Sequence, residues 1–473
     1  MPALGPEFKR IVQKPWGANM KTIKQVFGLL LLLVFTIGLI GGCDGGGSSD
    51  SDTAPPISDS GTAPPISGSN TAPTISDFSL SPKSAYLNSG GGQIDVSGTF
   101  TYTGANGGVA SVTFVSVDSS GNTTSSQTIP VDDNSGATSG AIKGVVTVGT
   151  TTVGTYIVRV SLTDKTGLSS NVLSENFTIS LFPWVSKAPM PHPRTQFAVA
   201  ASKGLAYVVG GELMGTGTIP GPDSALVDIY NPASNTWNAG VPLPTARKGP
   251  AAASVDSIIY VIGGQNLAGP LSVVEAYDPA TGQWTTKAPM PTPRSGAAAT
   301  VIEGRICVMG GTSAGLDLTT TECFDPISNA WSAGSPMPTF RRELGAASIG
   351  TYGYAVGGYS GGNFSGGGPG YVATVERYDI SANSWASMPP MPTERDSMAV
   401  AAVSGILYVV GGDNALNRSL ATVEAFDPSL MAWTTKTAMP VALTSVGGVL
   451  IDGKLYVFEQ GTTLEYTPEN DIL

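Results

Sequence analysis

The chain of 473 residues contains one histidine, His192, and three cysteines. A single imidazole excludes zinc and copper sites that need several histidine ligands, so we expect neither a metal ion nor a cofactor. Three cysteines cannot build a disulfide framework. We expect Cys307 and Cys323 to be buried free thiols that pack as small hydrophobic residues. Because they fall on successive predicted strands, a cross-strand disulfide between them stays open.

Basic side chains are also scarce. The chain has 24 lysine and arginine residues against 35 aspartate and glutamate residues, a formal net charge of −11, and no lysine- or arginine-rich run. Nucleic acid is not an expected partner, because binding to phosphates needs a basic surface. No phosphate-loop or nucleophile-elbow pattern is present either. Charged residues make up only 12% of the chain and glycine is abundant, which favours a turn-rich, all-β protein.

The C-terminal part of the chain repeats one pattern at intervals of about 50 residues. Each copy has an apolar strand closed by a diglycine, an acidic residue two positions before an aromatic, a tryptophan, and a proline-rich turn followed by arginine. The tryptophans are Trp184, Trp237, Trp284, Trp331, Trp385 and Trp433. The arginines are Arg194, Arg247, Arg294, Arg341 and Arg395, and the acidic residues are Asp228, Glu275, Glu322, Glu376 and Glu424.

This pattern resembles the kelch repeat, and the resemblance implies a six-bladed β-propeller over residues 182–473. The last copy departs from the pattern, because it lacks the diglycine, has Leu443 in place of the arginine and ends after Tyr466 without another tryptophan. We expect Trp184 to supply what this copy lacks. A blade with two C-terminal and two N-terminal strands would then close the ring and remove its free edges.

The N-terminus predicts an exported, lipid-anchored protein. Residues 1–42 contain Lys21 and Lys24 before an apolar run and then small residues, as in a secretory signal, with Met20 as the expected start. Cys43 directly after two glycines resembles the acylated cysteine of bacterial lipoproteins. A plain signal peptide or a membrane anchor is the alternative. Residues 43–76 are rich in Gly, Ser, Thr and Pro and predict an extended tether.

Residues 77–181 predict a β-sandwich. Short alternating runs occupy 94–103, 110–118, 126–131, 141–148, 154–164 and 172–180. In the clearest run, Tyr156, Val158, Val160 and Leu162 fall on one face, as in a half-buried antiparallel strand. The run and the turn after it resemble bacterial immunoglobulin-like modules.

The repeat provides an internal control for function. Features present in every copy are explained by the fold, so we expect the tryptophans to pack between blades and the acidic residues to hydrogen-bond within the scaffold. The five arginines are expected to pair with carboxylates or backbone, although a ring of guanidiniums that binds an anionic ligand stays open. Features that break the repeat are the candidates for a binding site.

The repeat breaks in the loops that follow the diglycines. These loops and the arginine-containing turns should share one face of the propeller, and the longest loop follows Gly357 and Gly358. Aromatic and charged residues in this sector predict a recognition surface for a protein or a glycan. Its expected binding residues are Phe340, Arg342, Tyr359, Phe364, Tyr371 and Arg418. Tolerant surface loops without a ligand are the alternative.

Together these features predict a membrane-anchored binding module of the cell envelope that faces the periplasm or the exterior. The alternative function is a carbohydrate enzyme similar to the kelch-type sialic acid mutarotases, which use acid and base catalysis. Its catalytic residues would be Glu343, Glu394, Asp396 and Arg342. The sequence names no ligand for either function.

Overall fold

The protein is built almost entirely from β-strands, as predicted. A computed structural model describes residues 37–39, 71–87, 92–131, 136–150, 153–215, 221–361 and 370–471. Cys43 and most of the predicted signal and tether lie outside the described residues. Among the residues that are described, the one helix is a 3₁₀ turn, Pro468–Asn470, and no helix is long and apolar enough to cross a membrane. The strands form two compact units, one from most of residues 71–176 and one from Phe177 onward.

Residues up to Leu181 form two sheets, with strand orders β1-β7-β4-β2 and β3-β9-β8-β5-β6. Strand β3 pairs with β9 in parallel, whereas the pairs β1–β7, β4–β7, β2–β4, β5–β8 and β5–β6 are antiparallel. The strands are β1 (Ile37–Leu39), β2 (Thr74–Ser81), β3 (Ser84–Leu87), β4 (Gly92–Thr103), β5 (Val109–Val117), β6 (Thr123–Pro130), β7 (Ser139–Thr150), β8 (Gly154–Asp164) and β9 (Leu173–Leu181).

The alternation read from the sequence matches six of these strands, β4 to β9. In β8 the side chains of Tyr156, Val158, Val160 and Leu162 are all buried, as predicted. Strands β2 and β3 were not predicted, and β2 begins at Thr74, inside the segment expected to be a tether. The proline and serine residues near β2 are typical of turns and linkers, so the alternation of apolar and polar residues in this strand was not recognised.

The second unit contains six four-stranded antiparallel sheets. The first three are β12 (Ala198–Ser202), β13 (Leu205–Val209), β15 (Val227–Asn231) and β16 (Thr236–Ala239); β17 (Ala251–Val255), β18 (Ile258–Ile262), β21 (Val274–Asp278) and β22 (Gln283–Thr286); and β23 (Ala298–Ile302), β24 (Arg305–Met309), β27 (Thr321–Asp325) and β28 (Ala330–Ala333). The next two are β29 (Gly345–Ile349), β30 (Tyr352–Val356), β33 (Val375–Asp379) and β34 (Ser384–Met388); and β35 (Ala399–Val403), β36 (Ile406–Val410), β37 (Val423–Asp427) and β38 (Ala432–Lys436).

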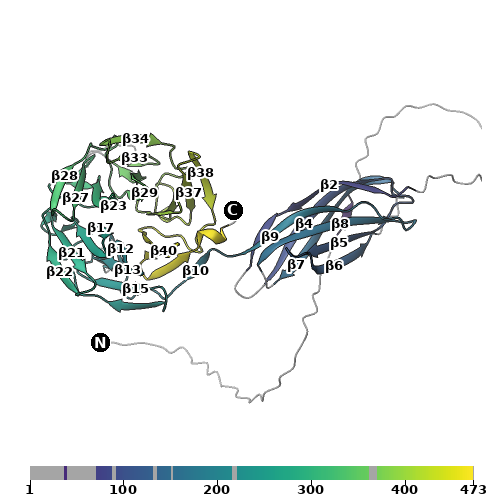
Figure 1. Ribbon diagram of the computed structural model, residues 1–473, viewed down its shortest axis with the longest axis horizontal. Helices are drawn as coiled ribbons and strands as arrows, with labels where there is room; N and C mark the ends of the chain where they lie inside the picture. Colours follow the sequence, from purple (N-terminus) through teal and green to yellow (C-terminus); the bar gives the residue numbers. More distant parts are fainter. Residues whose placement is uncertain are drawn as a thin grey trace, which may run out of the picture. The chain divides into compact units, whose positions relative to one another are not determined.

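The sixth sheet joins the two ends of this unit. It contains β39 (Gly447–Ile451), β40 (Lys454–Glu459), β41 (Thr462–Tyr466) and β10 (Trp184–Ser186), and β10 pairs with β41. The first strands of the six sheets neighbour one another in a ring, in which β39 contacts both β35 and β12 (Figure 1). This arrangement is that of a β-propeller.

The predicted division of the closing sheet was wrong, since three strands come from the C-terminus and one from the N-terminal side. The tryptophan strand is the outermost strand of its own sheet, and the strand after it is the first strand of the next sheet. Trp184 therefore brings only β10 to the closing sheet. Its ring packs against Tyr466, with centroids 4.7 Å apart, and its indole donates to the Thr437 carbonyl at 2.9 Å.

The five repeat arginines are scaffold, as expected. Each guanidinium is fully buried and pairs with the acidic residue on the third strand of the sheet that follows it. Arg247, for example, pairs with Glu275 and also donates to the carbonyls of Gly263 and Val273 at 3.1 Å. Burial lowers the pKa of all five guanidiniums, against the raising effect of the carboxylates. None of the five is available to an anionic ligand.

The sixth sheet replaces this buried ion pair with apolar residues. Leu443 takes the arginine position, and strand register places Leu464 opposite Val457, where Glu275 lies opposite Val261. Both leucines are buried in one apolar cluster. In the sixth sheet both members of the ion pair are replaced by leucine, so no charge is buried without its partner.

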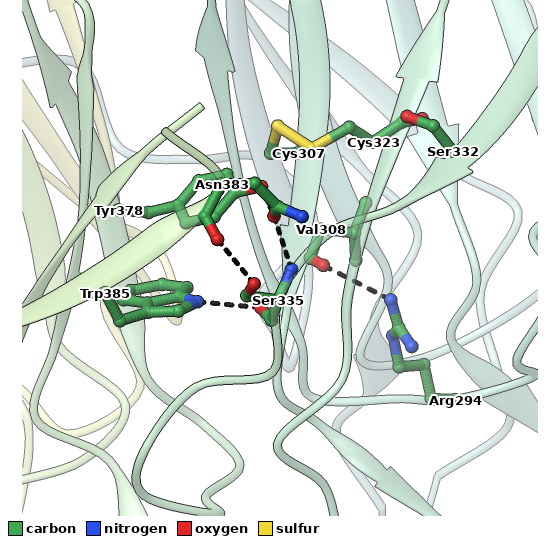
Figure 2. The surroundings of a disulfide bond; sticks show 9 residues. All are labelled: Arg294, Cys307, Val308, Cys323, Ser332, Ser335, Tyr378, Asn383 and Trp385. Atoms are coloured by element: carbon green, nitrogen blue, oxygen red, sulfur yellow. Dashed lines mark hydrogen bonds between the residues drawn. A yellow bond between two sulfur atoms is a disulfide. The ribbon is translucent and has the colours of Figure 1, made fainter. Parts of the chain in front are cut away.

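Cys307 and Cys323 form a disulfide, so the expectation of free thiols was wrong. They are direct partners on the adjacent strands β24 and β27, and both are buried. Figure 2 shows the bond beside the next sheet, where Tyr378 donates to Asn383 and Trp385 donates to the Ser335 carbonyl. The spacing of the cysteines in the sequence could not distinguish a bonded pair from two packed thiols.

Candidate functional site

The antiparallel sheets divide the connecting segments between two faces of the propeller. Segments that follow the second and fourth strands of each sheet lie on one face, which we call the loop face. The other face has only tight turns, such as Asp278–Gln283, where the Asp278 carboxylate accepts from the Ala280 amide at 2.8 Å. The sequence variation between copies is therefore concentrated on the loop face.

The loop face is organised by a ring of backbone hydrogen bonds between successive sheets. The amide of Gly249 donates to Gln196, Gly296 to Gly249, Glu343 to Gly296, Ser397 to Glu343, and Val446 to Ser397, at 2.7–2.9 Å. The Gln196 amide faces the Ser445 hydroxyl at 3.5 Å and completes the circle. The turn before the first strand of each sheet contributes one member, and five of these six turns contain a repeat arginine.

Three members of this ring hold an unusual backbone conformation. Gln196, Glu343 and Ser397 have φ values of 51°, 53° and 52°, in the left-handed region, and the equivalent Gly249 and Gly296 have 59° and 60°. A residue with a side chain costs about 1 kcal/mol more than glycine there. Two sheets use glycine and three do not, so the side chains at these three positions are kept despite strain, as at functional sites.

A cavity of about 430 Å³ opens inside this ring. Every sheet contributes to its lining through the residues just after its arginine position. The polar lining side chains are Gln196, Lys248, Gln265, Ser295, Thr312, Arg342, Glu343, Ser397 and Ser445, and Phe197 is its aromatic residue. The lining is polar and apolar in about equal parts, so the cavity is suited to bind a polar group that is carried on an apolar stem or flanked by apolar groups.

Outside this ring, the residue after each arginine pairs through its backbone with the residue after the diglycine. The pairs are Thr195–Glu212, Lys248–Gln265, Ser295–Thr312, Arg342–Tyr359 and Asp396–Asp413. The repeat thus holds ten side chains at fixed positions around the cavity and varies their chemistry from sheet to sheet.

The two cations that line the cavity are already paired. Lys248 donates to Glu212 at 2.7 Å, and Arg342 donates to Asp317 at 2.7 Å. Asp317 is fully buried and also accepts from the Gly361 amide at 2.9 Å. The Arg342 guanidinium lies 4.6 Å from the centroid of the Tyr359 ring, a cation–π contact. These contacts neutralise both cations.

Three carboxyl groups form a cluster beside Arg342. The Asp396 carboxyl hydrogen-bonds with Glu343 and with Asp413, and Asp396 is buried. Burial raises the pKa of Asp396, and its hydrogen bond to Asp413 and the charge of Glu343 raise it further. Burial also raises the pKa of Glu343, against the lowering effect of Arg342. Asp396 therefore keeps its proton at neutral pH and donates to a neighbouring carboxylate.

The predicted binding residues separate into groups. Arg342, Tyr359 and Tyr371 lie together, with the two tyrosine rings edge to face at 5.3 Å. The short strands β31 (Tyr359–Ser360) and β32 (Gly370–Tyr371) hold this pair. Phe340 and Arg418 are exposed and do not line the cavity. Phe364 lies outside the described residues.

The predicted catalytic residues are only partly brought together. Glu343 and Asp396 share the carboxyl cluster, but Arg342 is paired with Asp317. Glu394 is exposed, and its backbone carbonyl accepts from the Asn414 side chain at 3.2 Å. No group of acidic, histidine or cysteine residues within the described ranges could hold a metal ion. Of the four predicted catalytic residues, only Glu343 and Asp396 therefore share one site.

Sequence reasoning missed the cavity residues Gln196, Phe197 and Lys248 and the buried Asp317. They follow the arginine or the diglycine at fixed offsets, so aligning the copies at the arginines would have found the first three. Asp317 had no such signal, because it lies inside a short hairpin, β25 (Thr312–Ser313) and β26 (Leu316–Asp317), that the sequence pattern does not show.

The only histidine is explained by the scaffold. In four sheets a threonine before the arginine donates to the glutamate, as Thr245 does to Glu275 at 2.8 Å. In the first sheet His192 takes the threonine position and lies 2.9 Å from Asp228, the one aspartate in the acidic series. In the first sheet the histidine, which is longer than threonine, thus pairs with an aspartate, which is shorter than glutamate.

Two family models match the propeller sequence. The KLHDC2/KLHL20/DRC7 Kelch-repeats domain matches residues 172–358, and the Kelch motif matches residues 341–392 and 394–440. The chain contains kelch repeats. The repeat assignment made from the tryptophans, diglycines and arginines is therefore confirmed.

Curated proteins with kelch repeats are similar to part of this chain. An F-box/kelch-repeat protein of Arabidopsis thaliana is 31% identical over 105 residues, which are 21% of this chain and 24% of that protein. Kelch-like ECH-associated protein 1B of Danio rerio is 33% identical over 83 residues, 18% of this chain and 14% of that protein. Beta-scruin of Limulus polyphemus is 34% identical over 102 residues, 21% of this chain and 11% of that protein. The chain therefore spans a quarter or less of these relatives, and the likeness concerns the repeats.

Proposed function

We propose that this protein is a lipid-anchored, extracytoplasmic interaction module whose kelch repeats bind a protein partner through the loop face. The observation that carries the proposal is the arrangement of the loop face. Its backbone is the same in each copy of the repeat, whereas the side chains that it holds around the cavity differ from copy to copy. Kelch repeats are protein-interaction modules in general, and fold alone does not fix a partner. The partner is bound by side chains that differ from sheet to sheet.

Exposed apolar side chains support a protein partner. Met214, Leu267, Leu316 and Leu416 are exposed on the loops of four different sheets, with Leu267 fully exposed and Leu416 88% exposed. Ile327 and Leu430 are exposed on turns of the opposite face, so apolar exposure alone does not choose the face. The combination of apolar loop tips with a polar cavity favours the loop face, since interfaces combine apolar and polar contacts.

The extracytoplasmic location rests on the N-terminal sequence and on the disulfide. The signal-like residues 1–42 and Cys43 predict export and lipidation, and cleavage before Cys43 would remove the edge strand β1 and leave β7 paired with β4. The Cys307–Cys323 disulfide is consistent with this location, because disulfides persist in oxidising compartments and are rare in the cytosol. The residues between Cys43 and β2 would then act as the tether, and the first unit, which resembles an immunoglobulin-like domain, as a spacer.

The anchor is tested by Cys43→Ser in the full chain. We expect the variant to leave the membrane fraction and appear in the soluble envelope fraction, because acylation at this cysteine would be lost. Retention in the membrane would instead indicate an uncleaved apolar segment.

The binding face is tested by capture from envelope extract of the source organism, with the full chain as bait. Tyr371→Ala and Arg342→Ala should abolish capture of a saturable protein partner, whereas Ile327→Ser and Leu430→Ser on the opposite face should not. If capture persists in Tyr371→Ala and Arg342→Ala but is lost in Ile327→Ser and Leu430→Ser, the partner binds the opposite face and the proposal is wrong.

A further inference from the structure

We propose that the loop face recognises a partner segment that inserts a lysine or arginine side chain into the axial cavity beside Glu343, with apolar residues on both sides of that cation. This inference rests on the proposed function, because it specifies the chemistry of the partner at the same face. It is drawn from the charges, the backbone and the apolar tips around the cavity.

The charge around the cavity is the first argument. Its two cations, Lys248 and Arg342, are neutralised by Glu212 and Asp317. Glu343 also lines the cavity, and Asp396 and Asp413 lie behind it in the carboxyl cluster. The unbalanced charge at the cavity is therefore negative, so a cationic group is attracted and an anionic one repelled.

The backbone at Glu343 is the second argument. Gly249 and Gly296 occupy the equivalent positions with almost the same φ, so a side chain is not needed to form the ring. The Glu343 backbone amide donates to Gly296 and its carbonyl accepts from Ser397, so a ligand would contact the carboxylate, which also accepts a hydrogen bond from Asp396. A strained glutamate that lines a cavity is explained by a role for that carboxylate.

Aromatic residues beside the cluster make a cation a better ligand than a small neutral group. The Tyr371 ring lies edge to face with Tyr359, whose backbone pairs with Arg342 next to Glu343. The pKa of Tyr371 is raised, mainly by burial and then by Asp413 and Asp396. Tyr359 already holds the Arg342 guanidinium over its ring. Carboxylates next to aromatic rings bind alkylammonium and guanidinium groups through both charge and ring contacts.

The exposed apolar residues on the loops favour a protein segment over a small free amine as the ligand that carries the cation. Leu267 lies at the tip of the hairpin formed by β19 (Gln265–Asn266) and β20 (Gly269–Pro270), and Gln265 at its base lines the cavity. Leu316 lies directly after the turn of the β25–β26 hairpin, opposite Ser313, and Thr312 at the base of this hairpin lines the cavity. Apolar residues that flank an inserted cation would reach these tips and bury area that a small amine cannot.

The test uses the detergent-solubilised full-length protein and an array of short peptides. Each peptide has lysine, arginine, glutamate or alanine at its centre, flanked on both sides by leucine or by serine. We expect saturable binding of peptides with central lysine or arginine and leucine flanks, at least roughly tenfold tighter than the glutamate peptides. This binding should weaken as salt is raised, because it depends on charge.

Glu343→Gln is the decisive variant, since glutamine keeps the size of the side chain and removes its charge. Lysine-peptide affinity should fall at least roughly tenfold in this variant, whereas Ile327→Ser should leave it unchanged. Asp413→Asn is the second variant, in case the first does not fold. Equal binding of glutamate and lysine peptides, or unchanged affinity in folded Glu343→Gln, would overturn the inference. It would also be overturned if the protein bound glycans on an array but none of the peptides. If a protein partner is nevertheless captured through the loop face, the proposed function stands and only the cationic insert is wrong.

Discussion

Asp396 is a buried carboxyl that the fold holds next to two others. Its pKa is raised by burial, by Asp413 and by Glu343, so the folded chain keeps a proton that the unfolded chain releases near pH 4. The folded state is therefore penalised increasingly as the pH rises above about 4. Proteins accept a cost in stability of this kind where a functional site needs it.

Asp396→Asn should stabilise the free protein at neutral pH. Asparagine resembles the protonated acid and can still donate to Asp413, so the cost of holding a proton disappears. We expect a gain in unfolding free energy on the order of 1–3 kcal/mol at pH 7 that shrinks towards zero near pH 4. Urea unfolding of both proteins at pH 4, 5.5 and 7 measures this. A loss of stability at pH 7, or a difference that does not change with pH, would contradict the account of this carboxyl.

The buried arginines show that a charged pair must change as a unit. Arg247→Leu leaves the Glu275 carboxylate buried without its partner and should cost about 3–5 kcal/mol in unfolding free energy. The double change Arg247→Leu and Glu275→Leu copies Leu443 and Leu464 of the sixth sheet and should recover more than half of that loss. Denaturant unfolding of the three proteins gives the coupling between the two sites. Additive losses would show that the carbonyls contacted by Arg247 matter more than the carboxylate.

At the scale of elements, the strands were predictable and their grouping was less so. Period-two alternation identified β4 to β9, and the repeat pattern identified the second, third and fourth strands of the six sheets but not their first strands. The closing sheet was divided wrongly because a repeat in sequence begins and ends at arbitrary points, and only pairing shows that Trp184 lies on an outermost strand. The arginine pairs were predicted, since a feature present in every copy belongs to the fold.

The site was less predictable than the strands. Arg342, Tyr359 and Tyr371 were expected together and lie together, because they flank one long loop. The cavity was not expected, since its lining comes from all six sheets and no contiguous stretch of sequence shows it. The pairing of Arg342 with Asp317 was also unforeseen, and it removes the cation that the enzyme alternative required.

Strand β10 closes the ring with a single buried tryptophan. Trp184 is 4% exposed, and the other repeat tryptophans are only half-buried. Trp184→Ala should therefore cost about 3–5 kcal/mol in unfolding free energy, and Trp331→Ala, the matched control, clearly less. Limited proteolysis should cut the Trp184→Ala variant first near its C-terminus, where β41 loses its partner. Equal costs for both variants would mean that closure adds no stability beyond ordinary packing.

At the scale of the whole molecule, we propose a lipid anchor and a spacer before the kelch repeats, which present one variable face. Because the chain is acidic overall and has few basic residues, we do not expect nucleic acid to be a partner. The loop face carries the cavity, the carboxyl cluster and four apolar tips, whereas the opposite face carries short turns. The central claim is that a protein partner contacts the loop face.

Site-specific photocrosslinking in cells of the source organism tests this claim most directly. A photoreactive amino acid is placed in the full chain at Leu267 or Leu416 on the loop face, and at Ile327 or Leu430 on the opposite face, four positions that are all highly exposed. The account predicts one discrete crosslinked partner from the loop-face positions, which disappears with Tyr371→Ala, and none from the opposite face. The same partner crosslinked only from Ile327 or Leu430 would contradict it.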